Sequence, residues 1–191
     1  QKLNLLGLDR NALERYFLSI GEKAFHARQV MKWIYQRGVN DFSQMTDLRL
    51  ELRNLLSQQA VIELPTIANS QMSDDGTRKW LVKLADGNCV ETVFIPEEGR
   101  GTLCISSQVG CMLPGSFCAT ARQGFSRNLN ASEIIGQLLI ADQLLMTAGL
   151  GPRPVTNVVM MGMGEPLLNY EEVVSALRLM LDDMTFGLSR R

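Results

Sequence analysis

The cysteines of this chain are the side chains whose spacing most strongly suggests chemistry. The chain has four cysteines and one histidine among its 191 residues. The cysteines are Cys89, Cys104, Cys111 and Cys118. In a cytosolic protein such crowding favours metal or redox chemistry over structural disulfides, because thiolates are soft ligands for zinc and iron–sulfur clusters. Structural zinc is the weaker interpretation, because it usually requires a full set of ligands in close pairs and His26 is distant in the sequence.

The segment between the last two cysteines is the most informative one. Residues 111–118 read CMLPGSFC and follow a predicted strand at residues 102–106. Barrel enzymes carry their functional groups on loops of this kind, directly after a strand. Cys104 lies on the predicted strand, and taken alone it is a buried strand thiol. Cys89 is interpreted as a small hydrophobic residue.

The first part of the chain, residues 1–60, is predicted to be a small helical domain. Asp9 can cap a first helix, residues 25–37 form a second, and Thr46 can cap a third. Basic side chains gather around the second helix: Lys23, His26, Arg28, Lys32 and Arg37. We interpret them either as a solvated helix face or as a face that contacts RNA.

A change of pattern indicates strands in residues 61–100. Apolar and polar residues alternate there between turn sequences that contain glycine, which predicts an antiparallel β-meander. Glu91 falls on the same side of its strand as Val93 and Ile95. We therefore expect either apolar surroundings that raise the pKa of its carboxyl group or an edge position that faces water.

The last part of the chain, residues 101–191, alternates strand, loop and helix twice. This alternation predicts an α/β fold class with a parallel sheet or barrel. Asn130 with Glu133 is a variant of the capping box at the start of one helix, and Asn169 with Glu172 repeats it at the next. Two such units cannot close an eight-stranded barrel, so we expect the beginning of a truncated barrel.

The second strand of this part is predicted at residues 155–161 and is expected to be buried. The turn GMGEP follows it at residues 162–166. Met160, Met161 and Met163 are interpreted as packing residues, which is the usual role of methionine in a core.

Composition excludes few functions. The net charge is −1 and 46% of the residues are hydrophobic, as in soluble globular domains. The sequence has neither an apolar run long enough to cross a membrane nor the features of a signal peptide, so we expect a cytoplasmic protein without membrane contact. A balanced total charge still leaves room for a basic, nucleic-acid-binding face.

Several blocks of the sequence together resemble one family. They are residues 21–25 (GEKAF), 29–33 (QVMKW), 90–93 (VETV), 104–111 (CISSQVGC), 117–125 (FCATARQGF), 127–129 (RNL), 133–137 (EIIGQ) and 157–167 (NVVMMGMGEPL). In this order they are similar to the RlmN/Cfr family of radical-SAM RNA methyltransferases, and closer to its RlmN branch. The resemblance covers essentially the whole chain.

The resemblance implies methylation of C2 of an adenine in 23S rRNA and of an adenine next to the anticodon in some tRNAs. It implies two cofactors, a 4Fe–4S cluster and S-adenosylmethionine, because C2 of adenine is not nucleophilic and the cofactors must supply radical chemistry. The implied partners are 23S rRNA, tRNA and an electron donor such as a flavodoxin-type reductant, and we expect a monomer. Residues 101–191 would begin the radical-SAM barrel.

The same resemblance assigns cofactor-binding residues. Cys111 and Cys118 would bind the cluster, and Phe117 would lie beside the adenine of S-adenosylmethionine. Gly164 and Glu165 would bind S-adenosylmethionine, and the missing Cβ of Gly164 would let the backbone approach the ligand closely.

Two catalytic residues also follow from the resemblance. Glu91 matches the general base that removes the C2 proton. Cys104 matches a cysteine that resolves the covalent protein–RNA intermediate, and in the family it forms a disulfide with a second, methyl-carrying cysteine near the C-terminus.

The sequence departs from the family pattern at two points. Gly115 occupies the middle position of the cysteine motif, where the family has a thiolate ligand, and no cysteine follows Cys118. We therefore expect an incomplete fragment with a defective cluster motif. The alternatives are a catalytically inactive relative that binds RNA and a structural metal-binding module.

Overall fold

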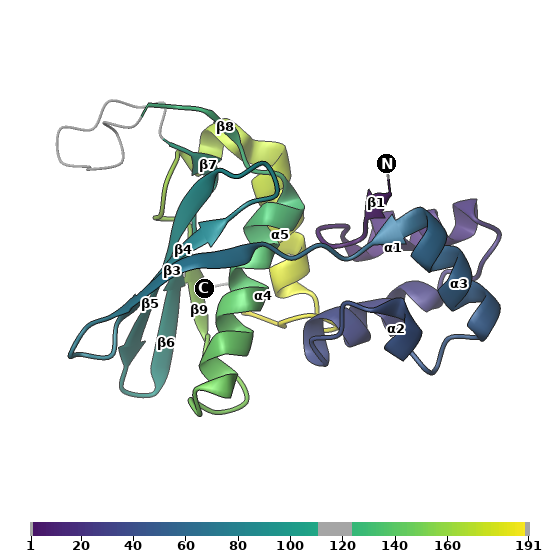
Figure 1. Ribbon diagram of the computed structural model, residues 1–191, viewed down its shortest axis with the longest axis horizontal. Coiled ribbons are helices and arrows are strands. Elements are labelled where there is room, and N and C mark those ends of the chain that lie inside the picture. The colour runs from purple at the N-terminus through teal and green to yellow at the C-terminus, as the bar shows by residue number, and fades with distance from the viewer. Residues whose placement is uncertain (1, 111–123, 190–191) are drawn as a thin grey trace.

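The computed structural model describes residues 2–110 and 124–189, and it is a mixed α/β protein. Its parts are an N-terminal group of helices, a five-stranded sheet and two longer helices between them (Figure 1). The α/β fold class is thereby confirmed. Within the described ranges, no helix combines the length and the apolar character that crossing a membrane would require.

The N-terminal region is helical, as predicted. Its elements are β1 (Leu3–Asn4), α1 (Arg10–Ser19), α2 (His26–Met31), the π-helix η1 (Lys32–Gln36), the 3₁₀-helix η2 (Phe42–Gln44), α3 (Leu50–Gln59) and β2 (Ala60–Val61). The Asp9 side chain accepts a hydrogen bond from the backbone N–H of Ala12 and caps α1, as expected. The expected cap at Thr46 is wrong, because the chain first turns between Met45 and Leu48 and α3 begins only after Arg49.

The central sheet is antiparallel except at one edge. Its strands are β3 (Thr66–Met72), β4 (Arg78–Lys83), β5 (Cys89–Glu97), β6 (Arg100–Cys104) and β9 (Asn157–Val159), in that spatial order. The meander β3–β6 is confirmed, and β9 runs parallel to β6. The sheet continues across residue 100, from β5 to β6. The domain boundaries expected at residues 60 and 100 stay predictions.

The strand predicted at residues 155–161 is shorter and less buried than expected. Only residues 157–159 form β9, and all three are half-buried. Within the described part of the chain, β9 pairs with β6 alone. Among the described strands, none covers the other edge of β9.

Two helices follow the strands of the parallel pair. They are α4 (Ala131–Thr147) and α5 (Tyr170–Leu181), and the short elements β7 (Gln108–Val109), β8 (Arg127–Asn128) and the 3₁₀-helix η4 (Pro166–Asn169) precede them. The capping box at the start of α4 is confirmed: the Asn130 side chain accepts from the N–H of Glu133, and the Glu133 carboxylate accepts from the N–H of Asn130. The predicted order of strand, loop and helix is thus present twice.

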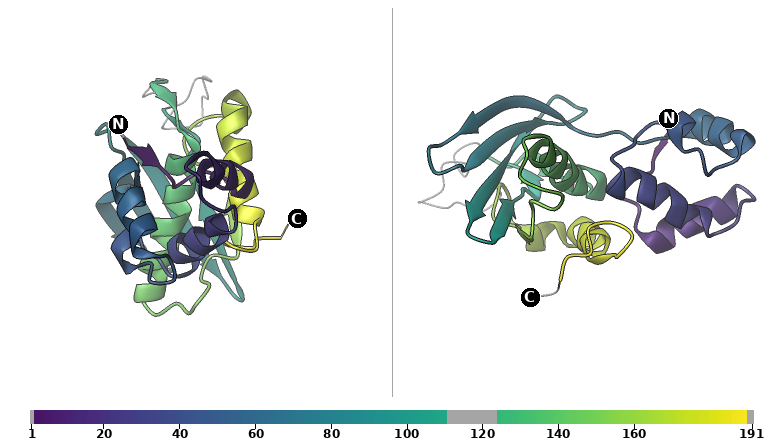
Figure 2. Two further views of the ribbon diagram at one scale, coloured as in Figure 1. Left: turned by 90° about the vertical axis from the view of Figure 1, so that its right-hand side faces the viewer. Right: turned by 90° about the horizontal axis from the view of Figure 1, so that it is seen from below.

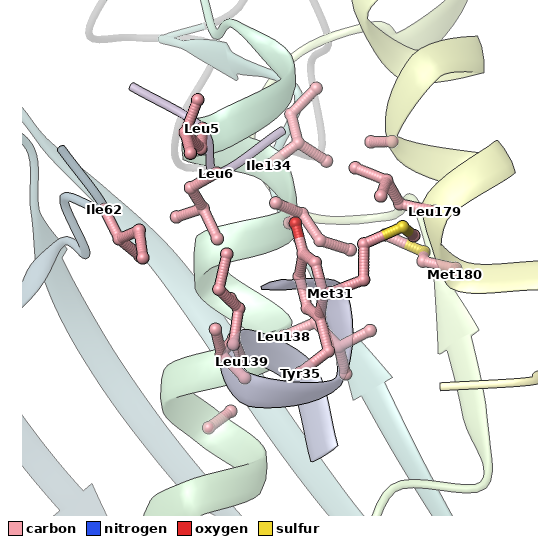
Figure 3. Packing of buried hydrophobic residues seen from close by; sticks show 14 of the residues in the cluster. Leu5, Leu6, Met31, Tyr35, Ile62, Ile134, Leu138, Leu139, Leu179 and Met180 are labelled. Atoms are coloured by element: carbon pink, nitrogen blue, oxygen red, sulfur yellow. The ribbon is translucent and has the colours of Figure 1, made fainter. Parts of the chain in front are cut away.

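Helices α4 and α5 lie between the sheet and the N-terminal helices (Figures 1 and 2). Leu6 and Met31 from the N-terminal region pack with Leu138 of α4 in one apolar cluster (Figure 3). Burying a side chain of this size contributes about 1.5–3 kcal/mol. Arg10 adds an ion pair to Asp182 after α5. The N-terminal helices are therefore docked firmly on one side of α4, while the sheet covers another.

Candidate active site on the open face of the sheet

The two faces of the sheet differ in burial. On β5, Val90, Thr92 and Phe94 are buried, and this face packs toward α4. The alternate residues Glu91 and Val93 are only half-buried. The strand register continues this second face across the sheet; its members are Lys79, Leu81, Glu91, Val93, Cys104 and Val159. We call these six residues the open face.

Glu91 lies on the open face, opposite Leu81 of β4. Its side chain is 36% exposed, and its carboxylate Oε1 lies 2.6 Å from Nζ of Lys79. The prediction that Glu91 shares a side with Val93 is confirmed. The alternative of an edge position is wrong, because β5 lies between β4 and β6. Leu81 and Val93 lie beside Glu91, and Lys79 pairs with its carboxylate. The sequence did not reveal Lys79 as the partner, because the pairing depends on the register between β4 and β5. The carboxylate is accessible and held by a cation.

Cys104 occupies the neighbouring position on the open face. It lies opposite Val93 of β5 and Val159 of β9, so it is a diagonal neighbour of Glu91, at the spacing of about 7–8 Å usual for such pairs. Its thiol is free and half-buried. Burial raises the pKa of this thiol, and a hydrogen bond from the backbone N–H of Met161 partly opposes that rise. The two predicted catalytic side chains thus share one face.

The turn after β9 begins beside Cys104 and is fixed to the end of β6. Gly162 donates its N–H to the carbonyl of Ile105 at 3.0 Å, and Met163 donates to Oγ of Ser106 at 2.9 Å. A Cβ added to Gly162 would lie 2.6 Å from Oγ of Ser106. Met163 is 5% exposed, as its predicted packing role requires, but Met161 is 80% exposed, so packing is the wrong interpretation for Met161.

Gly164 and Glu165 lie at the far end of this turn. Gly164 has a φ of +91°, and a Cβ there would lie 2.5 Å from Cβ of Gln108. Glycine is therefore required at this position. The group that the backbone of Gly164 approaches closely is the side chain of Gln108, where the sequence predicted a ligand. The N–H of Glu165 donates to Oε1 of Gln108 at 2.9 Å, and its carboxylate accepts from the N–H of Leu167 at 3.0 Å.

Asn169 does not cap α5 as expected. Its side chain makes no capping hydrogen bond; instead Nδ2 donates to the carbonyl of Ser107 at 2.8 Å and to that of Leu129 at 2.7 Å. Glu172 accepts from the N–H of Ala131 at 2.6 Å, across to α4. Both side chains therefore satisfy long-range partners, which local sequence patterns do not reveal.

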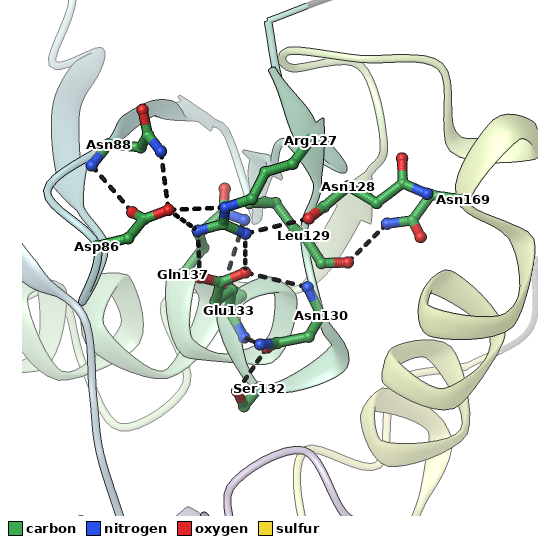
Figure 4. Close-up of polar contacts among 10 residues, drawn as sticks. All are labelled: Asp86, Asn88, Arg127, Asn128, Leu129, Asn130, Ser132, Glu133, Gln137 and Asn169. Atoms are coloured by element: carbon green, nitrogen blue, oxygen red, sulfur yellow. Dashed lines mark hydrogen bonds and ion pairs between the residues drawn. The ribbon is translucent and has the colours of Figure 1, made fainter. Parts of the chain in front are cut away.

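An arginine holds β8 between a turn of the sheet and the start of α4 (Figure 4). Arg127 donates to both carboxylate oxygens of Glu133 at 2.8 Å and to Asp86 at 2.7 Å. The pairing with Glu133 and then Asp86 raises the pKa of Arg127, and the hydrogen bond from Arg127 holds the pKa of the Asp86 carboxyl group well below its usual range.

A buried glutamine joins α4 to the sheet. Oε1 of Gln137 accepts from Oγ1 of Thr92 at 2.9 Å and from the N–H of Ser106 at 2.8 Å, and its Nε2 donates to the carbonyl of Ser106 at 2.9 Å. Oγ of Ser106 in turn donates to the carbonyl of Glu91 at 2.7 Å. Sequence reasoning missed Gln137, although a polar residue within the apolar run of α4 was a signal for it.

The remaining predicted site residues, Cys111, Phe117 and Cys118, lie outside the described residues, as does Gly115. Within residues 2–110 and 124–189, no group of three or more metal-binding side chains is present. Of the predicted site, the structure therefore places Glu91, Cys104, Gly164 and Glu165. These lie near the carboxyl ends of the parallel strands β6 and β9, or on the neighbouring strand.

A solved structure of similar fold gives the class of the protein. It is a radical SAM methyltransferase from Sphaerobacter thermophilus, with a TM-score of 0.87 and 36% sequence identity. The match covers 98% of this chain and 54% of that one. The chain thus has the fold of part of a radical SAM methyltransferase.

Sequence comparisons name the relatives that this chain resembles. Residues 3–62 match the family model described as the ribosomal RNA large subunit methyltransferase N-terminal domain. The chain is 59% identical over its whole length to the dual-specificity RNA methyltransferase RlmN of Francisella tularensis subsp. novicida, and 58% identical to that of subsp. holarctica. It spans about half the length of these relatives, 51% in both cases. The resemblance is confirmed: over its whole length this chain is similar to part of the RNA methyltransferase RlmN.

Proposed function

We propose that this chain is part of a cytoplasmic enzyme that methylates C2 of adenine in 23S rRNA and in tRNA next to the anticodon. One observation carries the proposal: Glu91, Cys104 and the start of the turn at residues 162–165 meet at one end of the open face. Reactive groups at the carboxyl ends of parallel strands are the usual arrangement in barrel enzymes.

Glu91 is proposed to accept the proton from C2. Its carboxylate is accessible, and Lys79 holds it in one orientation at 2.6 Å. The thiol of Cys104 lies beside it, where it can take part in resolving a covalent intermediate. S-adenosylmethionine and a 4Fe–4S cluster, when bound, would supply the radical chemistry that an unreactive ring carbon needs.

Glu165 fits the binding of S-adenosylmethionine. Oε1 of its carboxylate is occupied by the N–H of Leu167, while within the described residues Oε2 accepts no hydrogen bond. A carboxylate can pair with the cationic amino group of the ligand. Gly164 contributes through the close packing on Gln108 that fixes the backbone before Glu165.

The cysteine side chains of residues 111–118 do not provide the complete set of ligands that a 4Fe–4S cluster needs. Cys111 and Cys118 offer two thiolates, and Gly115 at the middle position offers none. The cluster needs the missing ligand, so we derive no catalytic step through it.

Iron and sulfide analysis after anaerobic reconstitution tests this disagreement. A Gly115→Cys variant is expected to gain iron and acid-labile sulfide in equal amounts, approaching about four of each per chain. Gly99→Cys is the matched control, because Gly99 lies in an exposed turn with nothing near its missing Cβ. Equal iron in both variants would contradict the assignment of residue 115 as a ligand position.

Methylation of 23S rRNA and tRNA transcripts tests the activity, with a flavodoxin-type reductant and a longer protein that joins this chain, carrying Gly115→Cys, to the C-terminal half of its RlmN relative with the methyl-carrying cysteine. Glu91→Gln is expected to lower the rate by roughly 10²–10⁴, the usual contribution of a general base. Glu97→Gln on the same strand is the control, since Glu97 is exposed and pairs only with Arg100 among the described residues. A Glu91→Gln variant as active as the control would contradict the proposed base.

A second candidate function is RNA binding without radical chemistry. The missing thiolate at Gly115 favours it, and so does an exposed face along α2 and the start of η1 that presents Phe25, Arg28 and Lys32. Reversing the charges of Arg28 and Lys32 should weaken RNA binding and flatten its salt dependence. Reversing exposed Arg15 on α1 is the control. Equal RNA affinity of both variants at the same salt concentration would remove α2 from the interface.

A further inference from the structure

Two buried amide side chains join three segments around the candidate site. Gln108 and Asn169 are 0% and 4% exposed. The segments are β7, which precedes residues 111–123, β8, which follows them, and the stretch from Gly164 to η4. We call Gln108 and Asn169 the amide clamp.

Gln108 contributes contacts in two directions. Its Oε1 accepts from the N–H of Glu165 at 2.9 Å, and its Nε2 donates to Oδ1 of Asn128 on β8 at 2.8 Å. Gly164 lies directly against it, because a Cβ at that position would be 2.5 Å from Cβ of Gln108. One side chain therefore sets the spacing between the turn and β8.

Asn169 makes the reciprocal connection from η4. Both hydrogens of Nδ2 are used, one on the carbonyl of Ser107 before β7 and the other on that of Leu129 after β8. Leu129 also donates its N–H to the carbonyl of Ser107 at 3.1 Å. Both ends of the segment that carries Cys111 and Cys118 are thus tied to the stretch that carries Glu165.

We propose that Asn169 is a positioning residue that fixes the turn at residues 162–165 relative to both strands flanking the cysteine segment. This inference rests on the proposed function in one respect, the assignment of that turn to S-adenosylmethionine. A buried amide with all its hydrogens used holds its partners in one arrangement. Without it, the two halves of the site would lose their fixed spacing.

The first test needs no ligand. Asn169→Asp keeps the shape of the side chain but removes both donated hydrogens, and Asn169→Ala removes them without adding a charge, in case the aspartate variant fails to fold. Amide hydrogen exchange of the chain is expected to become about tenfold faster at Leu129 and Glu165 in either variant. Amides in the middle of α5, such as Val174, should be unchanged.

Asn130→Asp is the matched control. It adds the same charge at the start of α4, directly after Leu129, and it keeps the oxygen that accepts the capping hydrogen bond from Glu133. Its exchange rates at Leu129 and Glu165 should equal those of the unmodified chain. Exchange that accelerates only within α5, or not at all, in the Asn169 variants would overturn the inference.

The second test separates positioning from mere stability. The dissociation constant for S-adenosylmethionine, measured well below the thermal midpoints of both variants, should rise about tenfold in Asn169→Ala but stay constant in Asn130→Asp. Unchanged affinity in Asn169→Ala would overturn the inference. If the unmodified chain itself binds no S-adenosylmethionine, that result contradicts the proposed function, and the exchange rates still decide whether Asn169 joins the three segments.

Discussion

The two faces of the five-stranded sheet have the same strands but different contents. The face toward α4 carries buried apolar side chains such as Trp80, Val82 and Phe94. The open face carries Lys79, Glu91 and Cys104, which are all at least partly accessible. One strand can serve both purposes because successive side chains point to opposite faces. The comparison teaches that alternate residues of the same strands have different roles: one set stabilises the fold, and the other carries the proposed chemistry.

The largest expected effect comes from a substitution on the face of the sheet that packs toward α4. Phe94→Ala should lower the free energy of unfolding by about 3–5 kcal/mol, because it removes a large, fully buried ring. Val93→Ala, one residue away on the open face, should lower it by less than about 1 kcal/mol. Urea unfolding followed by circular dichroism measures both. Similar losses in the two variants would contradict the difference between the faces.

A smaller effect is expected at the turn beside the open face. Gly164→Ala and Gly87→Ala both place a side chain at positive φ, +91° and +87°, which costs about 1–2 kcal/mol. Gly164 also contacts Gln108, whereas a Cβ at Gly87 meets nothing within 4 Å. We expect an additional loss of about 1–3 kcal/mol at Gly164 only. Equal unfolding free energies for the two variants would show that the contact with Gln108 does not constrain the turn.

The ion pairs of Arg127 give a pH-dependent effect. Arg127→Met should lower the thermal midpoint at pH 7 by about 2–4 °C. The pKa of Asp86 is depressed in the folded protein, chiefly by its hydrogen bond with Arg127. Its stabilisation is therefore fully present above the unfolded pKa of about 3.9 and is lost progressively as the pH falls from that value through the much lower folded pKa. The difference between the two midpoints should shrink steadily as the pH is lowered from about 4 towards about 2; a constant difference would contradict the pairing.

The smallest expected effect is on the reactivity of a thiol of the open face. Burial raises the pKa of Cys104, so less thiolate is present near pH 8 than in the unfolded chain, and the thiolate is the reactive form. Alkylation of Cys104 by iodoacetamide, followed by peptide mass spectrometry, should be slower in the folded chain at pH 8. The two rates should become more similar as the pH is raised, because more of the folded thiol is then ionised. Faster alkylation in the folded chain would indicate a lowered pKa instead.

The sequence predicted the features that depend on local chemistry. Asp9 caps α1, and Asn130 with Glu133 caps α4, because each interaction is made within one turn of chain. The side of the strand that Glu91 occupies followed from the two-residue period of β-strands.

The features that the sequence did not reveal depend on long-range contacts. Asn169 has the sequence pattern of a cap, but its partners are Ser107 and Leu129, on segments far away in the chain. Lys79 reaches Glu91 only because of the register between two strands. Such pairings are set by the packed fold, so a one-dimensional pattern cannot separate them from ordinary surface or capping residues.

Methyl NMR on addition of S-adenosylmethionine tests the central claim, that the ligand acts on the open face of the sheet. The account predicts changes in the methyl signals of Val93 and Val159, which flank Cys104 on that face. The signals of Val82 and Val90, buried on the opposite face, should remain in place. Unchanged signals for Val93 and Val159, or changes confined to Val82 and Val90, would contradict the account.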